Sequence, residues 1–372
     1  MTKKKIDRVV AIDLGNGLTN IRTVYPDGSP YELTLPSAFA KTESIGISFD
    51  GAGEKYNVSQ FVVDGGNYVW GEDVYKIKGL IHTASSHEER YEMSNYRTFI
   101  EIVLGKIAKD VDIQPTEQIL ISTGVPSNQT KPSTVEAIKN AFFGTSKEYK
   151  GLHRITVDGQ VYTINVAEVI VTSQPLATVL AHYLNEKGKV INKSLASKRI
   201  AIIDIGGGTT DLDTLVRFNR QENFRSIPVG FRQVYRAIRD EIRRQNDGKE
   251  VDVNDYELLN IIQNAEAKAN EEGTEPVYTY KISDKKAPID FTDTYLRALK
   301  ELGMIINMHI SEQWAEDFDN FDYVYLVGGS AKRLAPFIEI LKNPDFPRDP
   351  GKSNAEGYYN FGVAKMNELN AA

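Results

Sequence analysis

Two short segments of the chain carry the residue types of a phosphate-binding turn. They are Asp13-Leu-Gly-Asn-Gly-Leu-Thr-Asn20 and Asp204-Ile-Gly-Gly-Gly-Thr-Thr-Asp211. Each follows a short run rich in Val or Ile, which predicts a buried strand that ends in a tight turn. Glycine allows close approach and positive φ, so backbone N–H groups in such a turn can face phosphate oxygens. The two segments therefore predict two phosphate-binding turns, roughly half the chain apart.

The side chains of these segments indicate distinct roles. Asp13 and Asp204 stand at the strand ends, where a carboxylate can orient waters bound to Mg²⁺. The other positions offer N–H groups, amides and hydroxyls to phosphate. A single turn of this kind is more often only a turn, whereas two on successive domains can hold one polyphosphate from both sides. The predicted phosphate-binding residues are Gly15, Asn16, Gly17, Leu18, Thr19, Asn20, Gly206, Gly207, Gly208, Thr209, Thr210 and Asp211.

A third segment, Tyr325-Leu-Val-Gly-Gly-Ser-Ala331, again joins an apolar strand to two glycines. Gly328, Gly329 and Ser330 are predicted to bind adenosine, because backbone without side chains can lie flat against a purine and its ribose. Taken alone, the segment is equally compatible with an ordinary turn between a strand and a helix.

The elements around these turns predict an α/β fold. After each glycine turn, alternation resumes over Thr19–Val24 and Asp211–Val216, which indicates β-hairpins and argues against a Rossmann or Walker loop. Strands alternating with helices predict mixed sheets flanked by helices in two related domains. A glycine-punctuated stretch at about 46–78 is expected to be a small inserted subdomain. Helices are expected at Tyr96–Lys109, Thr134–Phe143, Pro175–Glu186, Phe231–Gln245, Tyr256–Asn270, Asp293–Trp314 and Ala335–Leu341.

Composition limits the functional classes. The 372 residues have a formal net charge of −7 with scattered basic residues, so we expect no direct contact with nucleic acid. The absence of cysteine excludes disulfides and thiolate chemistry. The N-terminal segment lacks the apolar core of a signal peptide, and no stretch approaches the ~18 apolar residues of a membrane span. A cytoplasmic protein without membrane contact is expected.

The three glycine motifs, in this order, resemble the nucleotide-binding signature shared by actin, the seventy-kilodalton heat-shock chaperones and sugar kinases. The resemblance implies an actin-like fold with ATP or ADP and Mg²⁺ in an interdomain cleft, while GTP stays open as an alternative. It also implies domain I at 1–186 and 343–372, and domain II at 187–342.

Four further positions gain predicted roles from the same resemblance. Gln174 falls where relatives place the residue that positions the attacking water; the alternative is an ordinary polar residue at a helix start. Since an amide cannot accept a proton as a carboxylate does, slow hydrolysis would follow. Gly230, Asn264 and Lys268 are predicted to bind the nucleotide. For Asn264 and Lys268 the alternative is a solvated face of a charged helix.

Within the superfamily, the chain is most similar to ParM-type plasmid-segregation actins and their archaeal relatives. This similarity rests on Asp13-Leu-Gly-Asn-Gly, on Val69-Trp-Gly-Glu72 and on Asn354-Ala-Glu-Gly-Tyr-Tyr. It implies an ATPase that forms head-to-tail filaments and reaches plasmid DNA through a small DNA-binding adaptor protein. A small-molecule kinase of the sugar-kinase type and another bacterial or archaeal cytoskeletal actin remain alternatives.

Overall fold

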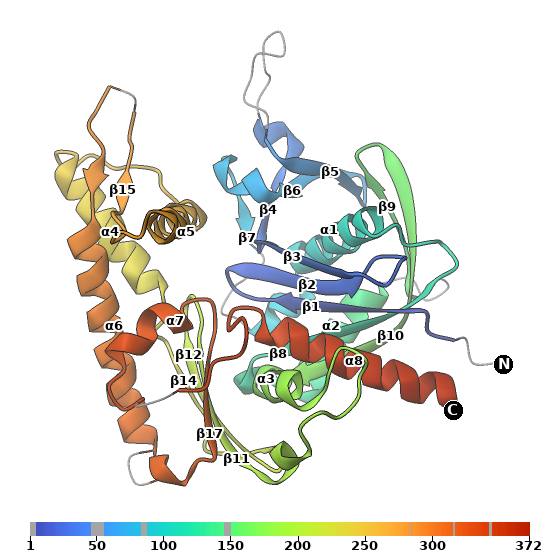
Figure 1. Ribbon diagram of the computed structural model, residues 1–372. Coiled ribbons are helices and arrows are strands. Elements are labelled where there is room, and N and C mark those ends of the chain that lie inside the picture. The colour runs from blue at the N-terminus through green and yellow to red at the C-terminus, as the bar shows by residue number, and fades with distance from the viewer. Residues whose placement is uncertain are drawn as a thin grey trace. The chain divides into compact units, whose positions relative to one another are not determined.

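The computed structural model describes residues 5–45, 56–82, 88–144, 150–283, 285–314, 317–341 and 344–372 (Figure 1). The chain forms two compact units. Unit 1 comprises Met1–Lys198, Leu215–Gln221 and Pro347–Ala372, and unit 2 comprises Arg199–Thr214 and Glu222–Phe346. Each unit has a mixed β-sheet with helices packed on it, which confirms the predicted two-part α/β architecture. The predicted boundaries after 186 and 342 remain a prediction.

The described residues of unit 1 form a ten-stranded sheet in the order β3-β2-β1-β8-β10-β9-β5-β6-β4-β7. The central strands β1, β8 and β10 run parallel, and β2 returns antiparallel to β1 after the first glycine turn. In chain order the strands are β1 (Arg8–Leu14), β2 (Leu18–Val24), β3 (Pro30–Pro36), β4 (Ala38–Lys41), β5 (Val58–Val63), β6 (Gly66–Gly71), β7 (Ile81–His82), β8 (Gln118–Val125), β9 (Leu152–Val157) and β10 (Gln160–Ser173).

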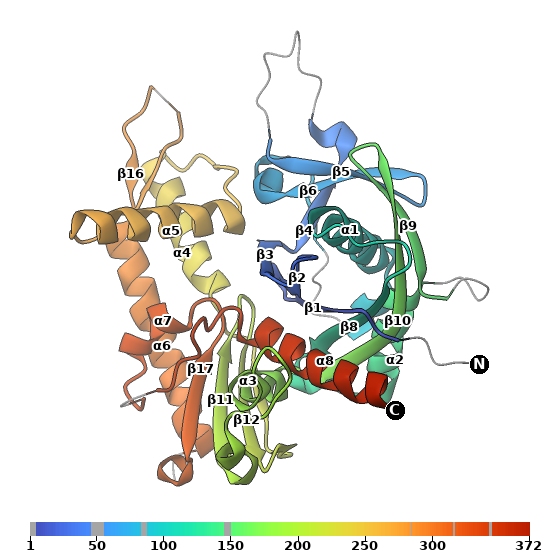
Figure 2. The same ribbon diagram turned by 45° about the vertical axis from the view of Figure 1, so that its right-hand side comes forward.

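Helices cover both faces of the central strands of unit 1. Since successive side chains of a strand point to opposite faces, Val10 and Ile12 of β1 pack into the larger apolar cluster, and Val9 and Ala11 pack into a second cluster. The larger cluster includes α1 (Ser94–Asp110) and α2 (Pro132–Phe143). The second includes α3 (Gln174–Tyr183) and α8 (Ser353–Ala371), which lie side by side in both ribbon views (Figures 1 and 2).

The predicted insert at 46–78 is described only from residue 56, because 46–55 lie outside the described residues. Its strands β5 and β6 form a hairpin whose two turn residues, Asp64 and Gly65, have positive φ of 48° and 78°. An Asp-Gly pair suits such a turn. Trp70 is fully buried and packs edge-on against Phe99 of α1, with ring centroids 5.2 Å apart. The hairpin therefore shares the larger apolar cluster of unit 1.

Unit 2 contains the second glycine turn and the adenosine segment. The five-stranded sheet has the order β13-β12-β11-β17, with β14 beside β12, and its short edge strand β13 and the last two residues of β12 are counted with unit 1. Alternate residues of β11, Ala201, Ile203 and Ile205, belong to one apolar cluster with residues of the neighbouring helices. The described elements are β11 (Arg199–Ile205), β12 (Thr210–Val216), β13 (Asn219–Arg220), β14 (Arg225–Ile227), α4 (Arg232–Gln245), α5 (Asp255–Glu272), β15 (Thr279–Tyr280), β16 (Ile289–Asp290), α6 (Thr292–Trp314), β17 (Tyr323–Val327) and α7 (Ala331–Leu334).

Six of the expected helices are present, but the expectation of a helix at Ala335–Leu341 is wrong. The chain forms the short helix α7 at Ala331–Leu334 and a single 3-10 turn at Ala335–Phe337. Pro336 lacks a backbone N–H and stands in the first turn of that 3-10 segment, so it cannot continue an α-helix from before. Helix α8 was not expected as a helix.

Across the described ranges, no helix is both long enough and apolar enough to cross a membrane.

Candidate functional site

The first glycine turn connects β1 to β2 in unit 1. The register pairs Asp13 with Asn20, so these two side chains flank the turn at the strand ends. A Cβ added to Gly15 would lie 2.7 Å from the carbonyl oxygen of Leu18, so only glycine fits there. A Cβ added to Gly17 would meet no described atom within 4 Å. The turn therefore combines one close backbone approach with one open backbone position.

Asp13 is buried at the base of this turn. The residue is only 7% exposed. Burial raises the pKa of the Asp13 carboxyl to about 6, against the lowering effects of hydrogen bonds from Asn20 and Gln174 and of the Arg90 charge. A cation at this position would favour the ionised carboxylate. The structure thus brings Asp13, Asn20 and Gln174 together.

Gln174 is the first residue of α3, directly after the end of β10. Strand β10 runs parallel to β8, and β8 runs parallel to β1, so Asp13 and Gln174 follow strands that end at the same edge of the sheet. The hydrogen bond from the Gln174 amide to Asp13 follows from this topology. Its catalytic role remains a prediction.

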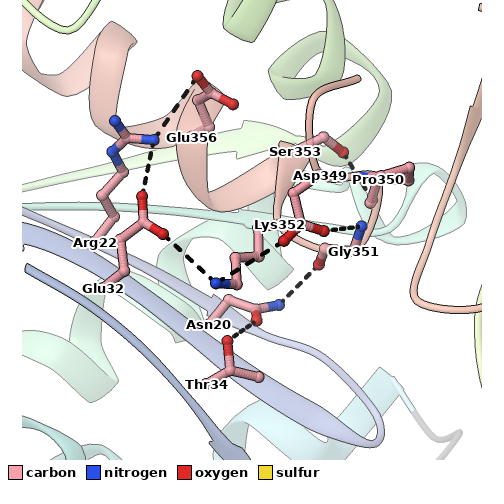
Figure 3. A network of polar contacts seen from close by, with 10 residues as sticks. All are labelled: Asn20, Arg22, Glu32, Thr34, Asp349, Pro350, Gly351, Lys352, Ser353 and Glu356. Carbon is pink, nitrogen blue, oxygen red and sulfur yellow. Dashed lines mark hydrogen bonds and ion pairs between the residues drawn. The ribbon is translucent and has the colours of Figure 1, made fainter. Parts of the chain in front are cut away.

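Asn20 connects the first turn to the start of α8 (Figure 3). Its amide nitrogen donates to the carbonyl of Gly351 at 3.1 Å, and its amide oxygen accepts from the Thr34 hydroxyl at 2.9 Å. Next to it, Glu32 forms ion pairs with Arg22 at 3.3 Å and with Lys352 at 3.5 Å. Asn20 therefore has a structural partner besides Asp13.

Three other predicted residues of the first turn differ in how they are placed. Thr19 is fully buried and its hydroxyl lies 2.9 Å from the Ser37 hydroxyl, so it supports the turn and presents no exposed group to a ligand. The Asn16 side chain accepts a hydrogen bond from Arg90 at 2.6 Å. Leu18 is half-buried at the start of β2.

The second glycine turn, between β11 and β12, is closed by its own backbone. The N–H of Gly206 donates to the carbonyl of Thr209 at 2.9 Å. Gly207, Gly208 and Thr209 are half-exposed, whereas Thr210 is buried and its hydroxyl donates to the Val229 carbonyl at 2.8 Å. The structure thus leaves the middle of the turn accessible and uses Thr210 for support.

Asp211 lies just beyond this turn and, like Thr210, forms a side-chain hydrogen bond that holds the start of β12 in place. It accepts a hydrogen bond from the Ser226 hydroxyl on β14. Burial raises the pKa of the Asp211 carboxyl, and the Ser226 hydrogen bond opposes that effect.

Gly230 packs directly against the second turn. The N–H groups of Phe231 and Arg232, which start α4, donate to the carbonyls of Gly206 and Gly207 at 3.1 and 2.8 Å. A Cβ on Gly230 would lie 2.7 and 2.8 Å from these two carbonyl oxygens. The structure therefore places Gly230 beneath the turn, where a side chain would displace it.

The adenosine segment lies beside the second turn, because β17 pairs with β11 in parallel. Gly328 has φ +98°, and a Cβ there would contact the Ile205 carbonyl and lie 2.9 Å from an Asp204 carboxylate oxygen. A Cβ on Gly329 would meet no described atom within 4 Å. Ser330 is buried directly before α7. Asp204, Gly206, Gly230 and Gly328 thus form one cluster in unit 2.

The last two predicted residues do not join this cluster by polar contacts. Asn264 and Lys268 are exposed on α5, and Lys268 pairs with Glu272 at 3.9 Å. Within the described part of the chain, no hydrogen bond or ion pair connects either residue to another predicted site residue. This exposed placement agrees with the alternative that Asn264 and Lys268 lie on a solvated face of a charged helix.

Sequence reasoning missed the charged residues next to the glycine segments. Arg333 forms a two-point ion pair with Glu266 of α5 at 2.8 and 2.6 Å, and its guanidinium reaches the Gly329 carbonyl at 3.5 Å. Arg90 contacts the first turn. Arg90 is 74 positions from Asn16, so no local pattern identifies it, whereas Arg333 lies two positions after the adenosine segment and could have been singled out by that position. Among the described residues, no group of three or more His, Asp or Glu side chains is arranged to hold a metal ion.

Two family models match the sequence. Residues 11–176 match the N-terminal domain of actin-like proteins, and residues 202–339 match the C-terminal domain of the archaeal MreB-like actin homologue. Together they cover more than three quarters of the chain and include both glycine turns and the adenosine segment. A comparison with curated proteins gives no match.

Solved structures of ParM proteins share the fold along nearly the whole chain. Apo pSK41 ParM is 21% identical with a TM-score of 0.70, covering 97% of this chain and 98% of that one. Bacillus thuringiensis ParM with ATP is 14% identical with a TM-score of 0.68, covering 98% and 99%. A 15-stranded ParM filament from Clostridium botulinum is 18% identical with a TM-score of 0.63, covering 96% and 99%. The chain belongs to the actin-like protein family.

Proposed function

We propose that this protein is an ATPase that binds Mg-ATP through its two glycine turns and polymerises into nucleotide-dependent filaments. The observation that carries the proposal is the cluster at the first turn, where Asp13 and Gln174 are in hydrogen-bond contact at the base of a glycine turn. A carboxylate and an amide so placed can orient waters next to a bound phosphate.

The residues present fit a magnesium nucleotide. Gly17 and Gly207 leave open backbone where a phosphate can approach, and Gly328 leaves room that a side chain would fill. When bound, Mg-ATP supplies the terminal phosphate that a water molecule attacks. In our proposal Asp13 and Asp204 hold waters on the metal, and the Gln174 amide orients the attacking water without removing its proton. Slow turnover follows from the missing general base.

The relatives support the filament part of the proposal. The Bacillus thuringiensis ParM structure contains ATP, and the Clostridium botulinum ParM structure is a filament. We propose that this chain likewise adds subunits head to tail, through a heterologous contact that does not close. We further propose a cytoplasmic role in plasmid segregation, in which a small DNA-binding adaptor connects the filament to DNA. GTP is the competing nucleotide to test.

Nucleotide binding is tested by calorimetry on the full chain with Mg-ATP, Mg-ADP and Mg-GTP. We expect the substitutions Asp13→Asn and Asp204→Asn each to weaken Mg-ATP binding about tenfold or more, because each removes a charge from the metal site. Asp158→Asn is the matched control, since Asp158 pairs with Lys109 at 2.6 Å on the hairpin between β9 and β10. Wild-type protein that binds no nucleotide would refute the proposal. If only one of the two Asp→Asn variants lost affinity for Mg-ATP, the proposal that both glycine turns bind the nucleotide would be refuted.

A further inference from the structure

The two predicted phosphate-binding segments lack positive charge. Residues 13–20 and 204–211 contain three aspartates and neither lysine nor arginine. A bound triphosphate carries several negative charges, and protein sites for such groups normally supply cationic donors. Magnesium offsets only part of that charge. A site built on these segments therefore needs a cation from elsewhere in the chain.

Arg90 places a cation at the first turn. It belongs to a 3-10 segment, Glu88–Glu92, and lies 74 positions along the chain from Asn16, to whose amide oxygen its Nη1 donates at 2.6 Å. The Arg90 charge acts on the Asp13 carboxyl and lowers the pKa of that group. The guanidinium is therefore hydrogen-bonded to Asn16 and close enough to Asp13 to act on its charge, and both residues belong to the predicted phosphate-binding turn.

The hydrogen-bond partners of this guanidinium are neutral, although the Arg90 residue is only 6% exposed. Nη1 donates to the Asn16 amide, and Nη2 donates to the Tyr91 hydroxyl at 2.7 Å. Across the described residues, no carboxylate forms an ion pair with Arg90, and its Nε is buried without a hydrogen-bond acceptor. Buried charges are normally paired, because an unpaired charge out of water is costly. The Asp13 carboxyl acts on Arg90 only through its charge and forms no ion pair with it among the described residues, so the guanidinium lacks a directly bonded anion.

The guanidinium is also held in one position. It lies over the Tyr91 ring, 4.7 Å from the ring centroid, and the Tyr91 hydroxyl donates to the Gln129 amide oxygen at 2.5 Å. The Tyr91 ring in turn packs edge-on against Tyr96 of α1. A planar, fixed guanidinium suits two-point binding of a phosphate oxygen pair.

We propose that Arg90 is a phosphate-binding residue of the nucleotide site, supplying at the first glycine turn the positive charge that the turn itself lacks. The inference deepens the proposed function and rests on it. The competing interpretation is that Arg90 only fastens the turn to Tyr91 and Gln129. That interpretation predicts equal losses for every adenine nucleotide, whatever its number of phosphates.

The test compares the affinities of ATP, ADP and AMP, each with Mg²⁺, for the full-length variants Arg90→Gln and Arg90→Lys. We expect Arg90→Gln to weaken ATP binding by about 10- to 100-fold, the range for losing hydrogen bonds to a charged group, and to weaken AMP binding far less. The ATP affinity of Arg90→Lys should lie between those of wild type and Arg90→Gln, because lysine keeps the positive charge but lacks the planar guanidinium. Arg8→Gln is the control, since Arg8 is equally buried in unit 1 but is paired with Glu117 at 2.7 Å.

The outcomes separate the two proposals. Wild-type binding with unchanged ATP affinity in folded Arg90→Gln would overturn the role of Arg90 alone. Equal losses for ATP, ADP and AMP would also overturn it, in favour of the fastening role. Wild-type protein that binds none of the three would overturn both proposals. If Arg90→Gln does not fold, unchanged ATP affinity and an unchanged ratio of ATP to AMP affinity in Arg90→Lys would still refute the inference.

Discussion

Residues of the first turn serve both the fold and the proposed chemistry. Asn20 is hydrogen-bonded to Asp13 and to the start of α8, and Thr19 is used entirely for packing against Ser37. The glycine positions could be predicted from the sequence, because backbone requirements are local. Arg90 could not, because its role depends on a contact between segments 74 positions apart. A sequence motif thus predicts the backbone conformation of a turn, whereas a charged side chain contributed by a distant segment can be identified only from the structure.

Gln174 gives the sharpest prediction at this scale. Replacement by alanine should leave the affinity for Mg-ATP within about twofold of wild type and lower the steady-state hydrolysis rate about 100-fold or more, because the water loses its orienting amide. Phosphate release and calorimetry on the same preparation measure the two quantities. Gln129→Ala is a comparison variant, since Gln129 also receives a hydrogen bond near this turn but contacts Tyr91 instead of Asp13. Undiminished hydrolysis by Gln174→Ala would remove the residue from the mechanism.

At the scale of elements, α8 shows why one helix escaped prediction. Its sequence contains Gly357 and Gly362, which lower helix propensity. Tertiary packing requires both glycines: a Cβ on Gly357 would collide with the Ala177 carbonyl of α3, and one on Gly362 would lie 2.6 Å from the Val9 side chain of β1. Close contact with a neighbouring helix and sheet overrides propensity here. The amphipathic helices α1 and α4 to α6, by contrast, were predictable from their own periodicity.

His153 connects three elements of unit 1 and should make their stability depend on pH. From β9 its Nδ1 lies 2.7 Å from a Glu101 carboxylate oxygen of α1, and its Nε2 lies 2.7 Å from the Phe142 carbonyl at the end of α2. Both partners accept, so both ring nitrogens are satisfied only in the imidazolium. Burial lowers the pKa of His153, but the hydrogen bond and charge of Glu101 and the Phe142 carbonyl outweigh it, and the pKa is raised above 6.5.

The sign of the effect follows from that shift. The stabilisation is fully present below about pH 6.5, the ordinary value, and is lost as pH rises through the folded-state pKa. We expect urea unfolding of unit 1 to become easier between pH 6 and 9, and His153→Gln to flatten this dependence while costing about 1–3 kcal/mol at pH 6. Fluorescence of Trp70 in a Trp314→Phe background reports unit 1, because each unit holds one of the two tryptophans. His309→Gln on α6 of unit 2 should keep the wild-type slope, and an equally steep slope in His153→Gln would contradict the assignment.

At the scale of the whole molecule, the two units repeat one plan. In each, a strand ends in Asp-x-Gly, turns on glycines and returns as the neighbouring strand. The order of these motifs resembles the signature of the actin superfamily, and that resemblance was sufficient to predict an actin-like fold. It was not sufficient to predict which surfaces join subunits, because such surfaces depend on side chains brought together only by the fold.

Polymerisation is the prediction that belongs to this scale. Adding Mg-ATP to the purified protein above a critical concentration should raise light scattering, with filaments visible by electron microscopy, because nucleotide binding favours the polymerising state. Mg-ADP should produce a smaller or shorter-lived rise. Asp204→Asn, with its weakened nucleotide binding, serves as the control and should need a higher Mg-ATP concentration for the same rise. Tight Mg-ATP binding with no scattering at any accessible concentration would refute the filament role while leaving the nucleotide site in place.

The placement of α8 has a consequence for biosynthesis. All of unit 2 is encoded between parts of unit 1, and residues 353–371 cover the face of β1 and β8 formed by Val9, Ala11 and Leu120. On the ribosome, unit 2 can therefore acquire all its residues before unit 1 does. Until translation reaches the closing helix, that apolar face of the nascent chain stays uncovered, and such a face is a natural point for chaperone capture.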